Sequence, residues 1–371
     1  MKILYVTTVG STMGFFKSLI YDLLQNGASV DIATNIDASS VPQCYYEWGC
    51  NVFNISTSRS PFSLGNFRAI KQIRKLAKNY DIVHCHTPLA SMAARIGCRR
   101  LRKKRGLKLI YTAHGFHFYT GSPIMNWIVY YPIEKICSRW TDAIITINKE
   151  DYELSRKRFS RCNNLMINGI GIDYHRFHNC KIDINAKREE LNIPLSSFVV
   201  ISVGELNDNK NHKVVIEAIS KTGISDIHYI IAGKGSINQK LKELAEKLGV
   251  NLHLLGSRDD VDELFRASNL NAFPSIREGF GLAAVEGMAS GLPLVCGDNR
   301  GTRCYAIDGM NSIICKKNTP EEYSNAIKRF YYDRELLNKM SINSVETAKK
   351  FDRSSTNKLI KDLYFDILNR S

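Results

Sequence analysis

Two acidic residues flank a glycine-rich turn in the segment REGFGLAAVEGMASGLPLV at residues 277–295. Glu278 and Glu286 stand eight positions apart, with Gly279 and Gly281 between them. On one continuous helix, eight residues would turn about 80° beyond two full turns, which is a poor arrangement for two carboxylates that act on one atom. The glycines instead predict a loop, with Glu278 before a helix and Glu286 in its second turn.

The start of this predicted helix is a candidate anion site. The first N–H groups of a helix have no partner within it and carry the positive end of its dipole. We therefore expect the amides of Phe280, Gly281 and Leu282 to bind an anion. With an acid on each side, the site suits a nucleotide-sugar, which has the order sugar, diphosphate, ribose. A pair of glycosidase carboxylates is disfavoured, because these two acids straddle the turn and do not face each other.

A lysine stands in a second strand-to-helix turn, VGELNDNKNH at residues 203–212. Lys210 at a helix start would oppose the helix dipole unless an anion lay beside it. The position favours a phosphate partner, and a surface lysine without a role is the alternative.

Glycine and histidine mark strand ends in the first half of the chain. Gly14, in the first strand-to-helix turn, would let the backbone approach an anion, although a plain turn explains it equally well. His114 and His117 flank a glycine after a strand and could bond a sugar hydroxyl or a phosphate. His84 and His86 form an H-x-H pair, but no third ligand stands at suitable spacing, so a structural role is favoured over a metal site.

Short β-rich runs alternate with amphipathic segments of helix length, which indicates parallel sheets covered on both faces. One set of strands is predicted at residues 2–8, 29–35, 51–56, 81–87, 108–114, 142–148 and 164–168. A second set is predicted at residues 198–204, 228–235, 251–256, 270–275 and 293–298, and the chain reads as helical from Glu321 onward. We expect an α/β protein of two doubly wound domains in tandem, with a linker near 176–190.

Composition narrows the function classes. The 371 residues exceed what one core usually supports, and we expect neither a signal peptide nor a membrane span of about 20 apolar residues. Ten scattered cysteines fit a reduced cytoplasm. Residues 1–178 carry a net charge of +13 and residues 179–371 only +2.

The basic residues concentrate between Asp81 and Glu134, where no acid occurs. A bare cationic face there would suit nucleic acid, an anionic membrane or a polyanionic substrate, unless it is only a solvated helix end. The apolar run at 124–133, which includes Trp127, could rest on an anionic leaflet or be a core helix. The cations are Arg95, Arg99, Arg100, Arg102, Lys103, Lys104, Arg105 and Lys108.

Glu278 to Glu286, within SIREGFGLAAVEGMASGLPLV, resembles the E-x7-E motif of the retaining glycosyltransferases of family 4, and the similarity spans nearly the whole chain. It is similar to bacterial transferases of capsular and exopolysaccharide assembly. The resemblance implies the GT-B architecture of two facing Rossmann-like domains. Residues 1–178 would form the acceptor-side domain and 190–350 the donor domain, with a C-terminal helix at 351–371 that packs back toward the first.

The family also implies roles for single residues. Glu278 would bond hydroxyls of the donor sugar, Glu286 would hold the ribose, and Lys210 would neutralise the diphosphate. His114 would face the sugar and the phosphate. The other donor-binding positions that the resemblance implies are Gly14, Gly256, Arg258, Phe280, Gly281 and Leu282.

The implied reaction moves a hexose or N-acetylhexosamine from a nucleoside diphosphate, UDP by family habit, to a saccharide acceptor that is linked to polyprenyl diphosphate. The anomeric configuration would be retained by front-face attack, with no metal or other cofactor. The enzyme would lie in the cytoplasm, on the inner face of the cell membrane. Alternatives are a nucleotide-sugar epimerase or phosphorylase of the same architecture, and a basic nucleic-acid binder, for which no stacking motif is present.

Two positions depart from the family pattern. Glu205 stands where many members have an arginine, so Lys210 would carry more of the diphosphate charge, or Arg258, Arg277 or Arg303 would compensate. Cys304 stands where glutamate is frequent, which weakens any role assigned to that position.

Overall fold

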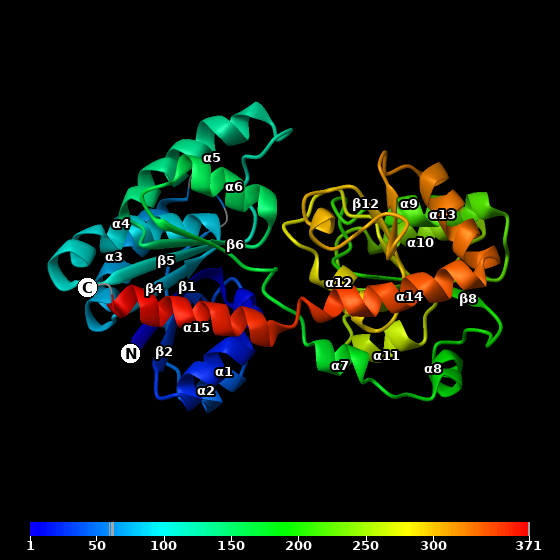
Figure 1. The fold of residues 1–371 in the computed structure, drawn as a ribbon, viewed down its shortest axis with the longest axis horizontal. Coiled ribbons are helices and arrows are strands. Elements are labelled where there is room, and N and C mark those ends of the chain that lie inside the picture. The colour runs from blue at the N-terminus through cyan, green and yellow to red at the C-terminus, as the bar shows by residue number, and fades with distance from the viewer. Residues whose placement is uncertain (59, 61–62, 370–371) are drawn as a thin grey trace. The chain divides into compact units, whose positions relative to one another are not determined.

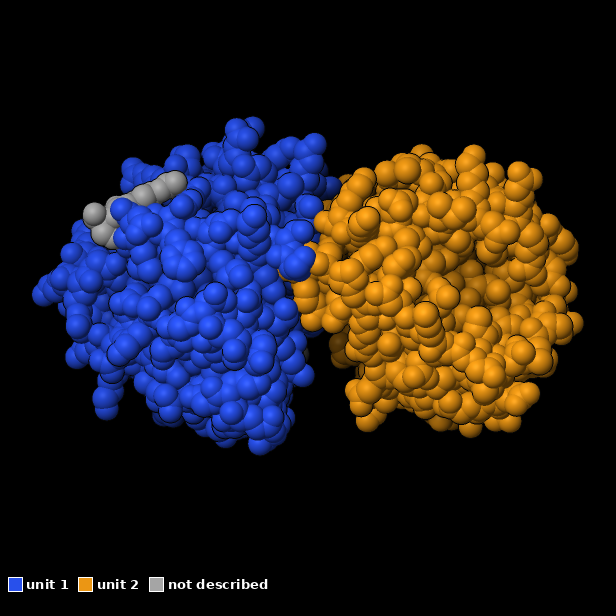
Figure 2. Space-filling model, turned by 60° about the horizontal axis from the view of Figure 1, so that its bottom comes forward, with its two compact units in different colours: residues 1–170, 354–371 blue, residues 171–353 orange. Residues whose placement is uncertain are grey.

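The chain divides into two compact units, each built on one parallel sheet (Figure 1, Figure 2). The computed structural model describes residues 1–58, 60 and 63–369. Unit 1 comprises residues 1–170 and 354–371, and unit 2 comprises residues 171–353. Both sheets carry helices on their faces, so the predicted class of two doubly wound, Rossmann-like α/β domains is confirmed.

Unit 1 contains a seven-stranded sheet with the order β3-β2-β1-β4-β5-β6-β7, in which all neighbours run parallel. Every strand predicted from the first half of the sequence is present. The bounds are β1 (Lys2–Val9), β2 (Ser29–Asn35), β3 (Val52–Asn54), β4 (Ile82–His86), β5 (Lys108–Ala113), β6 (Ala143–Thr146) and β7 (Asn163–Met166).

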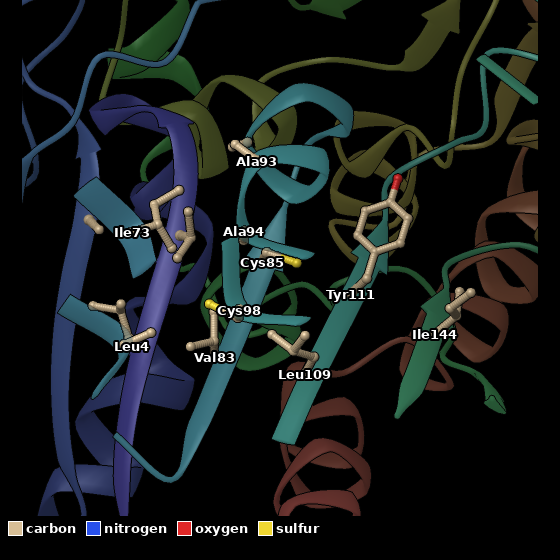
Figure 3. Close-up of a cluster of buried hydrophobic side chains, with 14 of the residues drawn as sticks. Leu4, Ile73, Val83, Cys85, Ala93, Ala94, Cys98, Leu109, Tyr111 and Ile144 are labelled. Atoms are coloured by element: carbon tan, nitrogen blue, oxygen red, sulfur yellow. The ribbon is translucent and has the colours of Figure 1, made fainter. Parts of the chain in front are cut away.

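Apolar side chains from the central strands of unit 1 meet helices on one face of the sheet (Figure 3). Val83, Leu109, Ala94 and Cys98 belong to this cluster, and all four side chains are buried. The helices of unit 1 are α1 (Lys17–Gln25), α2 (Cys44–Glu47), α3 (Leu64–Leu76), α4 (Pro88–Arg105), α5 (Ile124–Cys137), α6 (Lys149–Arg158) and α15 (Arg353–Asn369), with 3-10 turns η1 (Gly10–Phe16), η2 (Ala77–Asn79) and η3 (Ser138–Trp140).

Unit 2 contains a six-stranded parallel sheet with the order β10-β9-β8-β11-β12-β13. Its strands are β8 (Phe198–Val203), β9 (Ile227–Ala232), β10 (Asn251–Gly256), β11 (Leu270–Phe273), β12 (Leu294–Gly297) and β13 (Ser312–Cys315). The sequence analysis predicted each of these strands except β13. The helices are α7 (Tyr174–His178), α8 (Ile184–Glu190), α9 (His212–Thr222), α10 (Asn238–Leu248), α11 (Val261–Arg266), α12 (Leu282–Ala289), α13 (Pro320–Tyr332) and α14 (Arg334–Lys349), with the 3-10 turn η4 (Thr302–Cys304).

The segment 176–190, where the sequence suggested a linker, belongs to unit 2 and forms parts of α7 and α8. Its polar composition reflects helix capping. Asp173 accepts a hydrogen bond from the backbone N–H of Arg176 at 3.1 Å, and Asp183 accepts one from Asn185 at 2.9 Å. The chain passes between the units at residues 170–171 and 353–354 instead.

A buried polar network fixes α15 within unit 1. The hydroxyl oxygen of Tyr364 lies 2.7 Å from that of Tyr5 and 2.5 Å from Nδ1 of His84. Nε2 of His84 lies 2.7 Å from the hydroxyl of Thr112. Burial lowers the pKa of His84 to about 3, so the ring is neutral and both of its nitrogens have partners. The structural interpretation of His84 is confirmed.

Replacing Tyr364 with Phe would leave the Tyr5 hydroxyl and His84 Nδ1 without this partner. An unpaired buried polar group costs about 1–3 kcal/mol, so we expect the opening free energy of α15 to fall by about that amount. Hydrogen exchange of the α15 amides measures it. The control is Phe365→Ala on the same helix, whose side chain is 55% exposed. Equal protection in Tyr364→Phe and the wild type would contradict the network.

Candidate functional site

The strand order of unit 2 reverses between β8 and β11, which are hydrogen-bonded neighbours. Open α/β sheets bind ligands at such a point, beyond the carboxyl ends of the strands. The loop at 204–211 follows β8 and carries Lys210, and the loop at 274–281 follows β11 and carries Glu278. The topology therefore places both predicted residues at one edge of the sheet.

Lys210 and Glu278 contact each other directly. Nζ of Lys210 lies 2.5 Å from Oε1 of Glu278, and the two side chains are 22% and 13% exposed. The ammonium also lies 5.2 Å from the centroid of the Phe273 ring, within the range of a cation–π contact. The sequence predicted an anion beside Lys210. In this structure, that anion is the carboxylate of Glu278.

Hydrogen bonds hold the two loops together. The N–H of Ile276 donates to the carbonyl oxygen of Asn209 at 2.8 Å, and the side-chain amide of Asn209 donates to the carbonyl of Arg277 at 3.0 Å. From the loop after β12, the amide of Asn299 donates to the carbonyl of Ser275 at 3.0 Å. The backbone around Glu278 is therefore set by three loops.

The loop after β12 contains residues that the sequence analysis missed at this site. Nε of Arg300 lies 3.4 Å from the carbonyl oxygen of Glu278. A Cβ atom at Gly301 would stand only 2.7 Å from Cβ of Glu278, so a glycine is required for this approach. The signal available in the sequence was the run Asn-Arg-Gly directly after the strand predicted at 293–298.

Helix α12 begins at Leu282, as predicted, and no side chain caps its start. Gly281 precedes it with φ of 93°, and a Cβ there would lie 2.8 Å from the ring of Phe273 and from the hydroxyl of Tyr305. That hydroxyl donates to the carbonyl oxygen of Phe280 at 3.0 Å. The hydroxyl of Tyr305 thus fixes the turn from its buried side. In the first helical turn, the N–H of Ala284 donates to the carbonyl oxygen of Gly281 at 3.2 Å, whereas the N–H groups that precede it have no carbonyl group four positions earlier within the helix.

Glu286 lies in the second turn of α12 and carries an unusual carboxyl group. Burial raises its pKa to about 7. The positive charges of Arg353 and Arg176 oppose this shift, and Asp262 adds to it. The group therefore lies in a poorly solvated position that would gain from a ligand with hydroxyl donors.

Replacing Glu286 with Gln should change the pH dependence of stability. Between the ordinary pKa of 4.5 and about 7, the unfolded chain has released this proton and the folded chain has not, so rising pH disfavours the folded state. The glutamine variant lacks this penalty. We expect its Tm to exceed that of the wild type by an amount that grows from pH 5 to pH 8, equivalent to about 1–3 kcal/mol.

Thermal melts across this pH range test the expectation. Glu243→Gln, at an exposed position on α10, is the matched control. A difference between Glu286→Gln and the wild type that does not change with pH would contradict the desolvation of Glu286.

Two other predicted positions lie at the end of β10. Gly256 ends the strand with φ of 70°. Arg258 follows, and its guanidinium lies 2.6 Å from Asp260 and 2.9 Å from Glu190. These acids raise the pKa of the guanidinium, which already has anionic partners.

The arginines proposed to compensate for Glu205 differ in their surroundings. Arg303 lies 2.6 Å from Asp298, and Arg258 is paired as described. Arg277 is exposed, as is Glu205 itself. Lys210, by contrast, is partly buried and contacts Glu278 directly.

The sheet of unit 1 reverses its order between β1 and β4, and histidines lie at the neighbouring strand ends. His114 follows β5, is partly exposed, and has its pKa lowered to about 4 by burial. Its Nε2 lies 3.2 Å from Nδ1 of His86. His117 is exposed, and its ring packs 4.5 Å from that of Tyr130.

Two pockets open at this edge of unit 1. The first, of about 250 Å³, is lined by Thr8, Val9, Thr12, Thr87, Pro88, Leu89, His117 and Tyr130. The second, of about 290 Å³, is lined by Val9, Ser11, Asn35, Ala38, Ser39, Thr57 and Ser58. Thr87 has φ of 67°, a strained value for a β-branched residue and a frequent mark of functional sites.

Gly14 lies in η1, near the same edge. It is exposed, and a Cβ there would meet nothing within 4 Å. Packing within the protein therefore does not explain this glycine.

The prediction that the basic residues form a bare cationic face is wrong for two of them, Arg95 and Arg102. Arg95 is fully buried and pairs with Glu134 at 2.7 Å, and Arg102 forms a bidentate pair with Asp142, the shortest contact being 2.6 Å. Both acids lie beyond the acid-free stretch in sequence. The cations that remain exposed are Arg99, Arg100, Lys103, Lys104 and Arg105, most of them in the last turn of α4, where the helix dipole favours positive charge.

The residues that form the exposed apolar surface of α5 do not include Trp127, which the sequence analysis singled out. Trp127 is partly buried, and its indole N–H donates to the carbonyl of Tyr119 at 3.3 Å. Ile124, Met125 and Ile128 are instead 74%, 60% and 60% exposed. Over the described part of the chain, no helix has the length and apolar character needed to cross a membrane. Nor do the described residues group three or more potential metal ligands.

Comparison with known proteins identifies two family models. The model described as Glycosyltransferase Family 4 matches residues 16–173, and the model described as Glycosyl transferases group 1 matches residues 183–347. EpsD of Bacillus subtilis (strain 168), named as a glycosyltransferase, is 37% identical over 84% of this chain and 84% of its own. A UDP-Gal:alpha-D-GlcNAc-diphosphoundecaprenol alpha-1,3-galactosyltransferase of Escherichia coli is 28% identical over 82% of this chain and 80% of its own.

Solved structures share the fold at low sequence identity. HepE of Anabaena in complex with UDP matches with a TM-score of 0.80 at 20% identity, over 99% of this chain and 100% of HepE. WaaG, a glycosyltransferase of lipopolysaccharide biosynthesis, matches with a TM-score of 0.75 at 17% identity, over 98% of this chain and 99% of WaaG.

Proposed function

Since this chain belongs to glycosyltransferase family 4 and has the GT-B architecture, we propose that it transfers a hexose or N-acetylhexosamine from a UDP-sugar to a saccharide acceptor, with retention of configuration. The acceptor is a lipid-linked saccharide of cell-surface polysaccharide synthesis. The UDP complex of HepE and the name of the Escherichia coli relative support the donor and the lipid diphosphate.

One observation carries the donor site: the pair of Lys210 and Glu278 at the point where the sheet of unit 2 reverses, beside the uncapped start of α12. A diphosphate would take the place of the carboxylate as the partner of the lysine and would also accept from the amides at 280–282. Glu278, once released from Lys210, would accept hydrogen bonds from hydroxyls of the donor sugar. Glu286 would accept hydrogen bonds from the ribose hydroxyls, which would stabilise its poorly solvated carboxylate.

The mechanism that fits this site is electrostatic. An acceptor hydroxyl attacks the anomeric carbon on the face that the diphosphate leaves, the bond from that carbon to the phosphate oxygen breaks, and the leaving phosphate takes the hydroxyl proton. Charge grows on the diphosphate, where Lys210 and the amides would stabilise it. Glu278 is assigned to sugar hydroxyls and forms no covalent intermediate.

The acceptor is assigned to unit 1. Among the residues that the structure describes, the two pockets there are lined by hydroxyl, amide, aromatic, imidazole and apolar side chains, and none of these is Lys, Arg, Asp or Glu. This chemistry suits the neutral hydroxyls of a saccharide. His114, partly exposed at the same edge, would contribute a ring nitrogen to the substrate.

Metal independence is part of the proposal, and two alternatives accompany it. Turnover that survives EDTA would support it. A nucleotide-sugar epimerase or phosphorylase would convert the donor without an acceptor. A nucleic-acid binder would bind RNA in a salt-sensitive way and show no binding of nucleotide-sugar.

Conservative variants separate the two roles of the ion pair. Lys210→Gln should lose both UDP binding and at least about 100-fold in kcat/KM, because the diphosphate loses its cation. Glu278→Gln should keep the stabilisation by UDP but lose the further stabilisation by the UDP-sugar, because only the sugar contact changes. Thermal shift with each ligand and a transfer assay measure these effects.

Lys213→Gln on α9, at a side chain that is 64% exposed, is the matched control. Wild-type turnover in Lys210→Gln, Glu278→Gln and Glu286→Gln together would refute the site.

We also assign a peripheral position at the inner face of the membrane. Ile124, Met125 and Ile128 would enter the interface, and the exposed cations at the end of α4 would add about 1 kcal/mol each near anionic lipid. Replacing the three apolar residues with serine should abolish flotation with vesicles that contain phosphatidylglycerol. The control carries Leu359→Ser and Phe365→Ser, which remove exposed apolar side chains from α15. Equal flotation of the two proteins would count against this surface.

A further inference from the structure

We propose that His86 is a positioning residue that decides which ring nitrogen of His114 carries the proton, so that His114 presents Nδ1–H to its substrate. The contact with substrate depends on the proposed function. The positions of the protons on His86 and His114 in the protein without substrate depend only on the structure of unit 1.

His86 lies in a closed environment of rings at the end of β4. It is 1% exposed, and its ring centroid lies 4.2 Å from those of Phe16 and His84 and 5.5 Å from that of Tyr5. Its Nδ1 lies 3.2 Å from Nε2 of His114, and its Nε2 has no hydrogen-bond partner among the residues that the structure describes. The contact with His114 is thus the polar contact that orients this ring.

One proton must lie between the two rings. Burial lowers the pKa of both imidazoles, so each is neutral near pH 7.5 and carries a single N–H. If His114 Nε2 were the donor, His86 would hold its proton on Nε2, as a buried N–H without an acceptor. Orphaned buried N–H groups are rarer than acceptors with an unused lone pair. The favoured arrangement is therefore donation from His86 Nδ1 to His114 Nε2.

This arrangement fixes the chemistry of the outer nitrogen of His114. Since Nε2 accepts, the proton of that ring is on Nδ1, and the partly exposed side chain offers a donor. A hydroxyl oxygen or a phosphate oxygen can accept from it. Neutral histidine in water favours the Nε2–H form, so the contact with His86 selects the less common tautomer.

The test is nitrogen NMR of the full chain labelled with ¹⁵N-histidine at pH 7.5, through two-bond ¹H–¹⁵N correlations, with His114→Gln to assign the signal. We expect Nδ1–H for His114 in the wild type. His86→Phe should move it to Nε2–H, and His86→Asn, which keeps a donor near the position of Nδ1, should retain Nδ1–H. An Nε2–H signal for His114 in the wild type would overturn the proposal, even if both variants failed to fold.

Kinetics separate this proposal from the function. His86→Phe should lower kcat/KM by about three- to tenfold, as for one lost hydrogen bond, and should have no further effect in a His114→Gln background. Partial rescue by His86→Asn is expected. If the tautomer changes as described and turnover does not, the positioning of the ring is supported and the role of His114 in transfer is refuted.

Discussion

A single ammonium–carboxylate contact organises the site in unit 2. Lys210 and Glu278 belong to loops that leave adjacent strands, and neither charge is fully solvated. Each would be costly at this position without the other, because removing one partner leaves a poorly hydrated charge. The pair therefore keeps the free protein neutral at the place where a dianionic diphosphate is proposed to bind. A bound diphosphate would replace Glu278 as the anionic partner of Lys210, and the released carboxylate would accept hydrogen bonds from hydroxyls of the donor sugar.

The neighbouring backbone explains why the glycines of this region cannot be replaced freely. Gly281 has a left-handed conformation and lies against Phe273, and Gly301 lies against Glu278. Both close approaches bring main chain, not side chain, to the carboxyl edge of the sheet. A site made from backbone amides loses little conformational entropy when it binds a ligand, because the loops are already fixed by their own hydrogen bonds.

Local patterns in the sequence were sufficient for the strands and for the start of α12, since buried parallel strands and glycine turns have strong local signatures. They were insufficient where a partner comes from far along the chain. Arg95 and Arg102 meet Glu134 and Asp142, about 40 positions away, so an acid-free stretch was mistaken for a bare cationic face. The contact between Arg300 and Glu278 could not be predicted for the same reason. The loops after β11 and β12 meet only because these strands are neighbours in the sheet.

The polar side chains at the carboxyl edges of the two sheets differ in chemical type, and this difference fits the proposed substrates. At the carboxyl edge of unit 2, Lys210 and Glu278 form an ion pair, and burial raises the pKa of Glu286. At the corresponding edge of unit 1, the described residues that line the pockets carry hydroxyl, amide, ring and apolar side chains, and burial lowers the pKa of the His114 imidazole at the same edge. Hydroxyl, amide and imidazole side chains can match sugar hydroxyls one by one. The physical chemistry of each edge therefore favours a nucleoside diphosphate at unit 2 and an uncharged saccharide at unit 1.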